Sequence, residues 1–269
     1  MKPIVAIIIA MILFCDLTLA QDTLYLNKSG SVLWKQAVTD IDSVTFHKVY
    51  TAQPQGTVTD IDGNIYHTVT IGTQTWMVEN LKTTHYRNGD PIPNITDNSA
   101  WGNLTTGAYS NYNNDAIFAD TYSYGKLYNW YAVADIRNIA PSGWHVPTDI
   151  EWTLFINYLA SNGYGYEGSG YDICKSISST SGWAYAPSFG APGNDQTSNN
   201  STGFAGFPGG YRYNFGGFNY NGDWAYWWSS TEFDTYSAWF RSLYFNVSTV
   251  YSNKSNKVYG FSVRCLKDQ

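Results

Sequence analysis

The stretch PSGWHVPTDIEWTLFINYL, residues 141–159, is the most regular part of the sequence and decides the fold class. Two prolines bracket a Gly-Trp-His segment, and Pro147 stands directly before a strong helix start. Thr148 and Glu151 have the spacing of a capping box, in which each side chain bonds to a backbone N–H at the start of the helix. The pattern predicts a helix that begins at Thr148 and ends at Asn162-Gly163.

One face of this helix is expected to be apolar and to pack on a sheet. Apolar side chains recur along it at helical spacing, namely at Ile150, Leu154, Phe155, Tyr158 and Leu159. Burying Leu154 and Phe155 completely is worth about 1.5–3 kcal/mol each. We interpret the helix as a scaffold that pins the sheet, and we expect a second, weaker helix near residues 172–178.

Composition indicates an extracellular, β-rich protein. The chain has 269 residues, of which 43% are hydrophobic and 17% aromatic, so it can bury a sizeable core. Only 13% are charged, about half of the usual fraction, and polarity comes instead from Asn, Ser, Thr and Gly. A net charge of −6 without a basic cluster argues against nucleic acid as a partner.

The first twenty residues have the pattern of a secretory signal peptide. A basic start precedes an apolar run that is too short to span a membrane, and small residues before Gln21 predict cleavage there. Cys15 raises an alternative, because Ile12-Leu13-Phe14-Cys15 resembles a lipobox, although the bulky Phe14 fits that motif poorly. We therefore expect a secreted or cell-surface protein, and no later segment is long and apolar enough to cross a bilayer.

Turn signals divide the remaining chain into a short β-rich leader at 21–52, a linker at 53–56 and a main domain at 57–269. At the start of the main domain, Asp62-Gly63 between alternating segments predicts a hairpin, and Gly72-Thr73-Gln74 predicts a second turn. Residues 87–125 and 180–236 are rich in Gly, Asn and aromatics. We interpret them as long, ordered loops.

The end of the chain alternates with a period of two over 238–247 and again over 259–265, with a turn expected at 252–256. This predicts a C-terminal hairpin with Cys265 on its apolar side. Once the signal peptide is removed, Cys174 and Cys265 are the cysteines that remain. A disulfide between them and two separately buried thiols are equally compatible with the sequence.

The sequence offers little for metal or nucleophilic catalysis. The histidines do not pair at a metal-ligand spacing, and G-x-S-x-G is absent. Asp60, Asp62 and Asn64 resemble the start of a calcium loop, but no glutamate stands where an EF-hand requires one, so a hairpin turn explains them better. We expect neither a metal nor a cofactor.

Five segments occur together in an order that resembles a known family. They are GTQTWMVENL (72–81), GWHVPTDIEW (143–152), GFAGFPGGYR (203–212), WWSSTE (227–232) and GFSVRCLKD (260–268). Together they resemble the Fibrobacter succinogenes major paralogous domain, which is found in secreted and surface bacterial proteins. The order of helix, loops and terminal strand is also similar, more weakly, to the C-type-lectin and formylglycine-generating-enzyme folds.

The resemblance implies an α+β domain of C-type-lectin-like type, with a small twisted antiparallel sheet, helices on one side and long loops on the other. It does not carry formylglycine-generating activity to this chain, because Cys174 and Cys265 are not close together in the terminal region. The calcium-lectin signatures Glu-Pro-Asn and Trp-Asn-Asp are absent as well. Fold alone licenses no activity.

Binding is the function that the composition favours. Aromatic rings stack on the flat faces of sugars, while Asn, Asp and backbone groups meet their hydroxyls. Candidate ligand-binding residues gather in one loop region: Tyr211, Tyr213, Tyr220, Asp223, Trp224 and Tyr226. The alternative is that these rings are core side chains of ordered loops.

We therefore expect a non-enzymatic recognition module for an extracellular glycan or protein ligand. One alternative is a polysaccharide hydrolase, with Asp223, Glu232 and Asp234 as candidate carboxylates by their proximity in sequence alone. The motif Ser229-Ser230-Thr231 beside two tryptophans is interpreted as structural. A structural or adhesion protein without a small ligand is the third hypothesis.

Overall fold

The computed structural model describes residues 23–28, 31–37, 55–117, 124–168 and 170–269. By its internal contacts the chain divides into two compact units, Met1–Phe46 and His47–Gln269. In the first unit, β1 (Thr23–Lys28) and β2 (Ser31–Ala37) pair as an antiparallel hairpin. The predicted signal peptide, Cys15 and residues 53 and 54 of the linker lie outside the described residues.

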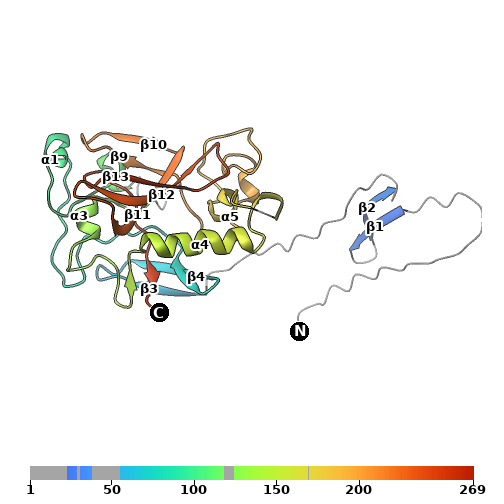
Figure 1. Ribbon diagram of the computed structural model, residues 1–269, viewed down its shortest axis with the longest axis horizontal. Coiled ribbons are helices and arrows are strands. Elements are labelled where there is room, and N and C mark those ends of the chain that lie inside the picture. The colour runs from blue at the N-terminus through green and yellow to red at the C-terminus, as the bar shows by residue number, and fades with distance from the viewer. Residues whose placement is uncertain (1–22, 29–30, 38–54, 118–123, 169) are drawn as a thin grey trace, which may run out of the picture. The chain divides into compact units, whose positions relative to one another are not determined.

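The second unit combines short helices with antiparallel sheets, which confirms the α+β class (Figure 1). A five-stranded sheet has the order β3-β4-β5-β14-β8, with bounds Gly56–Thr59, Ile65–Ile71, Gln74–Met77, Leu266–Lys267 and Trp144–His145. A three-stranded sheet is formed by β11 (Trp224–Glu232), β12 (Ser237–Tyr244) and β13 (Tyr251–Asn256).

Two further strand pairs and several helices complete the unit. The pairs are β9 (Gly209–Arg212) with β10 (Phe218–Asn221), and β6 (Tyr109–Ser110) with β7 (Leu127–Tyr128). The helices are α1 (Asn98–Gly102), α3 (Trp130–Val133), α4 (Asp149–Ser161) and α5 (Cys174–Ile177). Within the described residues no helix has the length and apolarity that crossing a membrane requires.

The expected hairpins are present at the start of the domain. The Asp60 carboxylate accepts hydrogen bonds from the backbone N–H groups of Asp62 (3.0 Å) and Asn64 (2.9 Å), which fixes the turn between β3 and β4. Gly63 takes a φ of +84°, a conformation that glycine adopts without strain. The tight turn between β4 and β5 lies at Gly72, against the ring of Tyr158.

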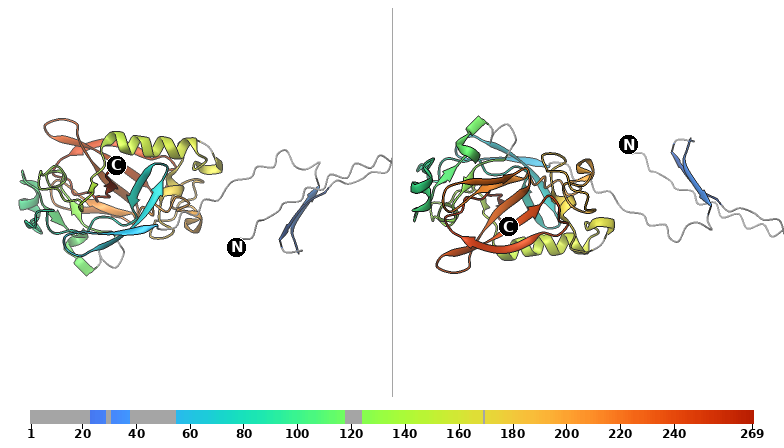
Figure 2. Two further views of the ribbon diagram at one scale, coloured as in Figure 1. Left: turned by 90° about the horizontal axis from the view of Figure 1, so that it is seen from below. Right: turned by 90° about the horizontal axis from the view of Figure 1, so that it is seen from above.

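Helix α4 begins as predicted. Thr148 accepts a bond from the Glu151 N–H, and the Glu151 carboxylate accepts one from the Thr148 N–H at 2.8 Å, so the capping box is complete. Arg241 of β12 is buried and donates to the Asp149 carboxylate at 2.6 Å, which ties the helix to the three-stranded sheet. Figure 2 shows α4 along one edge of the domain in both views.

The predicted buried face of α4 was wrong in part. Phe155 and Leu159 are buried, but Ile150, Leu154 and Tyr158 are 71%, 58% and 37% exposed. The side chain that replaces them in the interior is Trp152, which packs on Trp76 with ring centroids 4.7 Å apart. A large indole offers more apolar area than a leucine, so the helix turns Trp152 inward and leaves Ile150 and Leu154 toward solvent.

The described core consists of one small and two large clusters. The central core contains Tyr226, Trp228, Phe240 and Phe261. The helix core contains Trp76, Trp152, Phe155, Phe204 and Trp227, whose rings contact one another at centroid distances of 4.7–6.3 Å. Aromatic residues thus fill the interior as well as the surface.

The C-terminal hairpin does not have the predicted strands. Strand β12 pairs with β13, and Ser242 lies opposite Tyr251, so residues 252–256 are strand and not turn. Residues 259–265 form no regular strand; Gly260, Phe261 and Ser262 instead bridge to Arg212, Tyr128 and Trp227. This segment is almost wholly buried, so its backbone groups bond to several partners instead of one neighbouring strand.

The helix orientation can be tested by a matched pair of substitutions. Phe155→Ala is expected to lower the free energy of unfolding by about 3–5 kcal/mol, because it opens a cavity in the helix core. Leu154→Ala changes the same helix at an exposed position and is expected to stay within about 0.5 kcal/mol of the parent. Urea unfolding measures both, and equal losses would contradict the orientation described here.

Candidate functional site

A row of partly exposed rings crosses the sheets on the side formed by β9, β10, β12 and β13, which lie above α4 in Figure 1. None of these rings is fully buried, and Phe215 is 73% exposed. We call this row the aromatic strip; its members, in spatial order, are Phe215, Tyr213, Tyr259, Tyr211, Tyr220, Trp224, Tyr244 and Tyr251.

The strip is continuous, since each ring contacts the next. Centroid distances between successive members lie between 3.5 Å for Tyr220 and Trp224 and 5.8 Å for Tyr211 and Tyr220. The sheet creates this continuity, because Trp224 of β11 lies directly opposite Tyr244 of β12 in the strand register. Beneath the strip lies the central core.

Tyr220 is held in a strained conformation. Its φ is +61°, in the left-handed region that side chains other than glycine rarely adopt. Its ring stacks on Trp224 at an angle of 14° between planes and remains 42% exposed. Such a conformation costs of order 1–3 kcal/mol and persists only where the surrounding structure holds the residue in place. Residues of this kind are found most often at functional sites.

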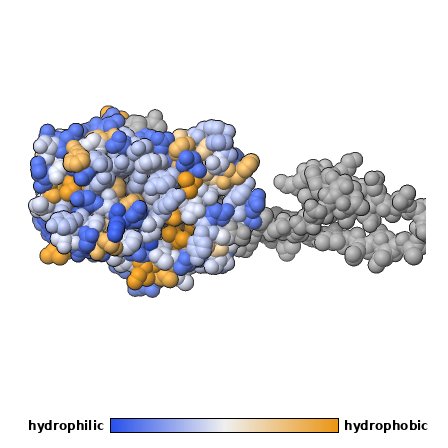
Figure 3. All heavy atoms as spheres, turned by 45° about the horizontal axis from the view of Figure 1, so that its top comes forward, coloured by the Kyte–Doolittle hydropathy of each residue, from blue (hydrophilic) through white to orange (hydrophobic). Residues whose placement is uncertain are grey.

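The strip is neutral and rich in hydroxyl groups. Burial, together with neighbouring tyrosines, raises the pKa of Tyr211 to about 12. Burial and a hydrogen bond to Tyr213 also raise the pKa of Tyr259. These hydroxyls therefore keep their protons at neutral pH and can both donate and accept hydrogen bonds. On the face shown in Figure 3, strongly hydrophobic residues form only small, separate patches.

The structure places the predicted binding residues in different surroundings. Tyr211, Tyr213, Tyr220 and Trp224 belong to the strip. Tyr226 is only 6% exposed and stacks on Phe261 at 4.8 Å, so it supports the strip from below. The half-buried Asp223 stands at the start of β11, where its carbonyl accepts a bond from the Phe245 N–H.

Four strip members were not among the predicted binding residues: Phe215, Tyr244, Tyr251 and Tyr259. Phe215 lies in the same loop region as the predicted residues, whereas the three tyrosines lie in the C-terminal part of the chain, where nothing in the sequence relates them to residues 211–224. Alternation did place Tyr244 on the face opposite Leu243, which is buried. The pairing of β11 with β12 brings Tyr244 beside Trp224, and the pairing of β12 with β13 brings Tyr251 beside Tyr244. The bridge between Arg212 and Gly260 brings Tyr259 beside Tyr211.

The carboxylates considered for hydrolysis do not form a pair across a cleft. Asp223 and Glu232 lie at opposite ends of β11, about 20 Å apart as judged from the six residue steps of the paired strand, whereas glycosidase pairs lie about 5–10 Å apart. Glu232 bonds to Lys257, and Asp234 accepts bonds from the N–H groups of Tyr236 and Ser237 at 2.8 Å each.

The serine and threonine of the WWSSTE motif serve the fold. The Ser229 carbonyl accepts a bond from the Trp130 indole at 2.9 Å, and the Thr231 hydroxyl accepts one from the Asp149 N–H at 2.9 Å. In the part of the chain that the structure describes, no three His, Cys, Asp or Glu side chains are grouped to hold a metal ion. The hydrogen bonds of Ser229 and Thr231 agree with the structural interpretation of the motif.

The two cysteines are separate thiols, the second of the alternatives that the sequence left open. Cys174 is buried in the helix core and Cys265 in the central core. Burial raises the pKa of both thiols well above the ordinary value. Neither thiol is therefore a nucleophile in the folded protein.

This thiol state predicts a simple reactivity pattern. A thiol-reactive disulfide reagent at pH 8 is expected to leave Cys174 and Cys265 unmodified in the folded chain and to modify both after unfolding in guanidinium chloride, because the thiols are then exposed and ionise normally. Absorbance of the released thiolate measures the reaction. Unfolded, unreduced protein that shows no reactive thiol would demonstrate a disulfide instead.

Comparison with known proteins identifies the family. No curated protein and no solved structure matches this chain. A family model, the Fibrobacter succinogenes major domain, matches residues 69–267, which span β5 to β14 and include the whole aromatic strip. The chain therefore belongs to the Fibrobacter succinogenes major domain family.

Proposed function

We propose that this domain is a non-enzymatic recognition module that binds extended glycan chains along the aromatic strip. The observation that carries the proposal is the unbroken row of partly exposed rings from Phe215 to Tyr251. Monomeric proteins seldom leave so many large rings in contact with solvent without a partner for them.

The chemistry of the strip suits sugars. Ring faces take up the C–H side of a pyranose, and protonated tyrosine hydroxyls beside them exchange hydrogen bonds with sugar hydroxyls. A row of rings repeats this arrangement, so it favours a chain of sugars over a single one. The absence of charge on the strip favours a neutral polysaccharide over an acidic peptide.

The proposal includes the cellular setting and the finer fold. Residues 1–20 are proposed to export the chain, which gives the domain access to extracellular glycans. The mixed sheets with long loops are proposed to be a C-type-lectin-like arrangement. Binding would be independent of calcium, because the calcium-lectin signatures are absent from the sequence.

Substitution of the stacked pair tests the proposal. Tyr220→Ala with Trp224→Ala is expected to weaken binding about 30-fold or more, since aromatic stacking contributes about 1–3 kcal/mol for each planar group. Tyr185→Ala is the matched control, because Tyr185 is 77% exposed and lies outside the strip. A glycan array and titration calorimetry with the best ligand measure binding, and thermal unfolding measures stability.

Three results would contradict the proposal. Unchanged binding by the double variant would remove the strip as the site, and a collapse of thermal stability would show that Tyr220 and Trp224 are core residues. A parent protein that binds no glycan but self-associates in sedimentation experiments would favour an adhesion protein instead.

A further inference from the structure

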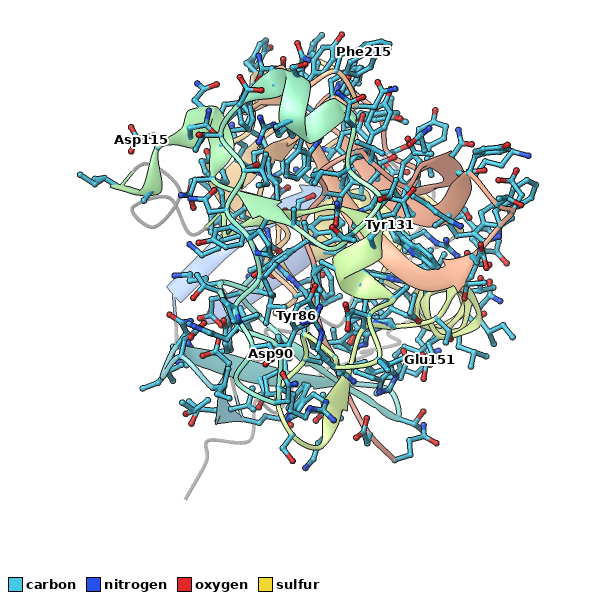
Figure 4. All side chains as sticks on the ribbon, turned by 90° about the vertical axis from the view of Figure 1, so that its left-hand side faces the viewer. Tyr86, Asp90, Asp115, Tyr131, Glu151 and Phe215 are labelled. Carbon is cyan, nitrogen blue, oxygen red and sulfur yellow. The ribbon has the colours of Figure 1, made fainter. Side chains whose placement is uncertain are left out.

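A cavity of about 220 Å³ lies away from the aromatic strip. Its walls come from the turn after β3, the segment around His85 and Arg87, and residues 139–142. Figure 4 places Phe215, one end of the strip, at the upper edge of the domain and Tyr86, the neighbour of the cavity residues, well below it. The cavity is thus independent of the proposed glycan site.

His85 is oriented by Asp62. The His85 Nδ1 atom lies 2.5 Å from Asp62 Oδ1, so Nε2 is the ring nitrogen left for a ligand. Partial burial opposes ionisation of Asp62, but bonds from the Thr84 N–H, His85 and the Thr83 hydroxyl lower its pKa below the ordinary value. His67 and His145 also pair with carboxylates, but neither lines this cavity.

The carboxylates at the cavity are already satisfied. Asp62 accepts bonds from His85, from the Thr83 hydroxyl at 2.9 Å and from Thr84. Asp60 accepts the turn N–H groups of Asp62 and Asn64 and the Tyr66 hydroxyl at 2.6 Å. Neither carboxylate therefore needs a donor from a ligand.

Arg87 has the opposite character. Its Nε donates to the Ala140 carbonyl at 3.0 Å, and its Nη2 donates to the carbonyls of Pro141 and Trp144 at 2.8 and 2.6 Å. Within the described residues no carboxylate forms an ion pair with Arg87 and no partner is found for its Nη1. The exposed guanidinium is thus held in place by backbone carbonyls.

His85 and Arg87 both line the cavity, and Tyr86 between them is fully buried. Ser142 adds a hydroxyl to the lining, and Ile139 and Pro141 add apolar surface. The polar groups of the lining left for a ligand are therefore the Nη1 of Arg87, the Nε2 of His85 and the Ser142 hydroxyl.

We propose that this cavity binds a small organic carboxylate, with a sugar acid as the ligand class. The Nη1 of Arg87 carries two N–H donors that no protein acceptor in the described residues uses, and the Ser142 hydroxyl in the same lining is a further donor for a carboxylate. The apolar wall covers the carbon skeleton. The site does not depend on the strip, so it stands even if the strip binds no glycan.

Titration by NMR tests the site in the full domain. D-glucuronate is expected to shift the His85 imidazole resonances, while its neutral methyl ester and D-glucose leave them unchanged. Acetate distinguishes the source of recognition: a shift with acetate shows that the carboxylate suffices, and a shift with glucuronate alone shows that the sugar ring is required. Absence of a shift with both acids would overturn the proposal.

Variants show whether binding occurs in this cavity. Arg87→Gln is expected to weaken glucuronate binding at least 10-fold. Ser142→Phe is expected to fill the cavity without removing a hydrogen-bond partner of Arg87. We expect the fold to accept it, because Ser142 stands in an exposed turn before Gly143 (φ +77°). The Trp144 N–H and the Pro141 carbonyl close this turn. Tyr220→Ala is the control and retains binding. Undiminished binding by the folded Ser142→Phe variant would contradict the assignment.

Discussion

Arg264 and Arg212 place positive charge in the interior of the domain. The long loops depend on the hydrogen bonds that their carbonyls accept from these two guanidinium groups. Arg264 is fully buried and donates to the Asn80 side-chain oxygen at 2.8 Å and to the Phe204 carbonyl. Burial lowers the pKa of Arg264 to about 9, so it stays charged at neutral pH. Moving such an ion out of water costs several kcal/mol, and the carbonyls with the Phe204 ring, 4.2 Å away, offset that cost.

Arg212 likewise donates hydrogen bonds to loop carbonyls beneath the aromatic strip. Its Nε donates to the Gly216 carbonyl at 2.9 Å, its Nη2 to the Thr96 carbonyl at 3.1 Å, and its guanidinium lies 4.3 Å from the Trp101 ring. Both carbonyls belong to irregular backbone, and the Thr96 carbonyl also accepts a bond from the Asn114 side chain at 3.1 Å. Because Arg212 stands between Tyr211 and Tyr213, the same side chain that satisfies the loops also fixes two rings of the strip.

Close packing around Arg212 restricts the residue at Gly260. A Cβ atom at that position would lie 2.9 Å from the Arg212 side chain and 3.0 Å from the Trp101 ring. The terminal motif GFSVRC therefore needs glycine for the backbone to approach Arg212, and it needs Arg264 to join distant loops. The family motifs that the sequence displays are, in this structure, the residues that connect one loop to another.

Local signals were readable from the sequence, and long-range ones were not. The capping box of Thr148 and Glu151 and the hairpin at Asp62-Gly63 were predicted correctly, because neighbours in sequence decide them. The side of α4 that Trp152 occupies depends on Trp76, and the strip membership of Tyr244 depends on its pairing with Trp224; both contacts join segments far apart in the chain. The buried role of the arginines gave no periodic signal, and polar residues are not expected inside without a partner.

Amide hydrogen exchange on Arg212→Met tests the dependence of the loops on buried guanidinium groups most directly. The substitution keeps apolar volume but removes the donors to the Thr96 and Gly216 carbonyls. Residues 95–101 and 213–217 are expected to lose protection while β11 and β12 keep theirs, with the exposed Arg137→Met variant as control. Unchanged protection in both loops would show that packing alone holds them and would contradict this account.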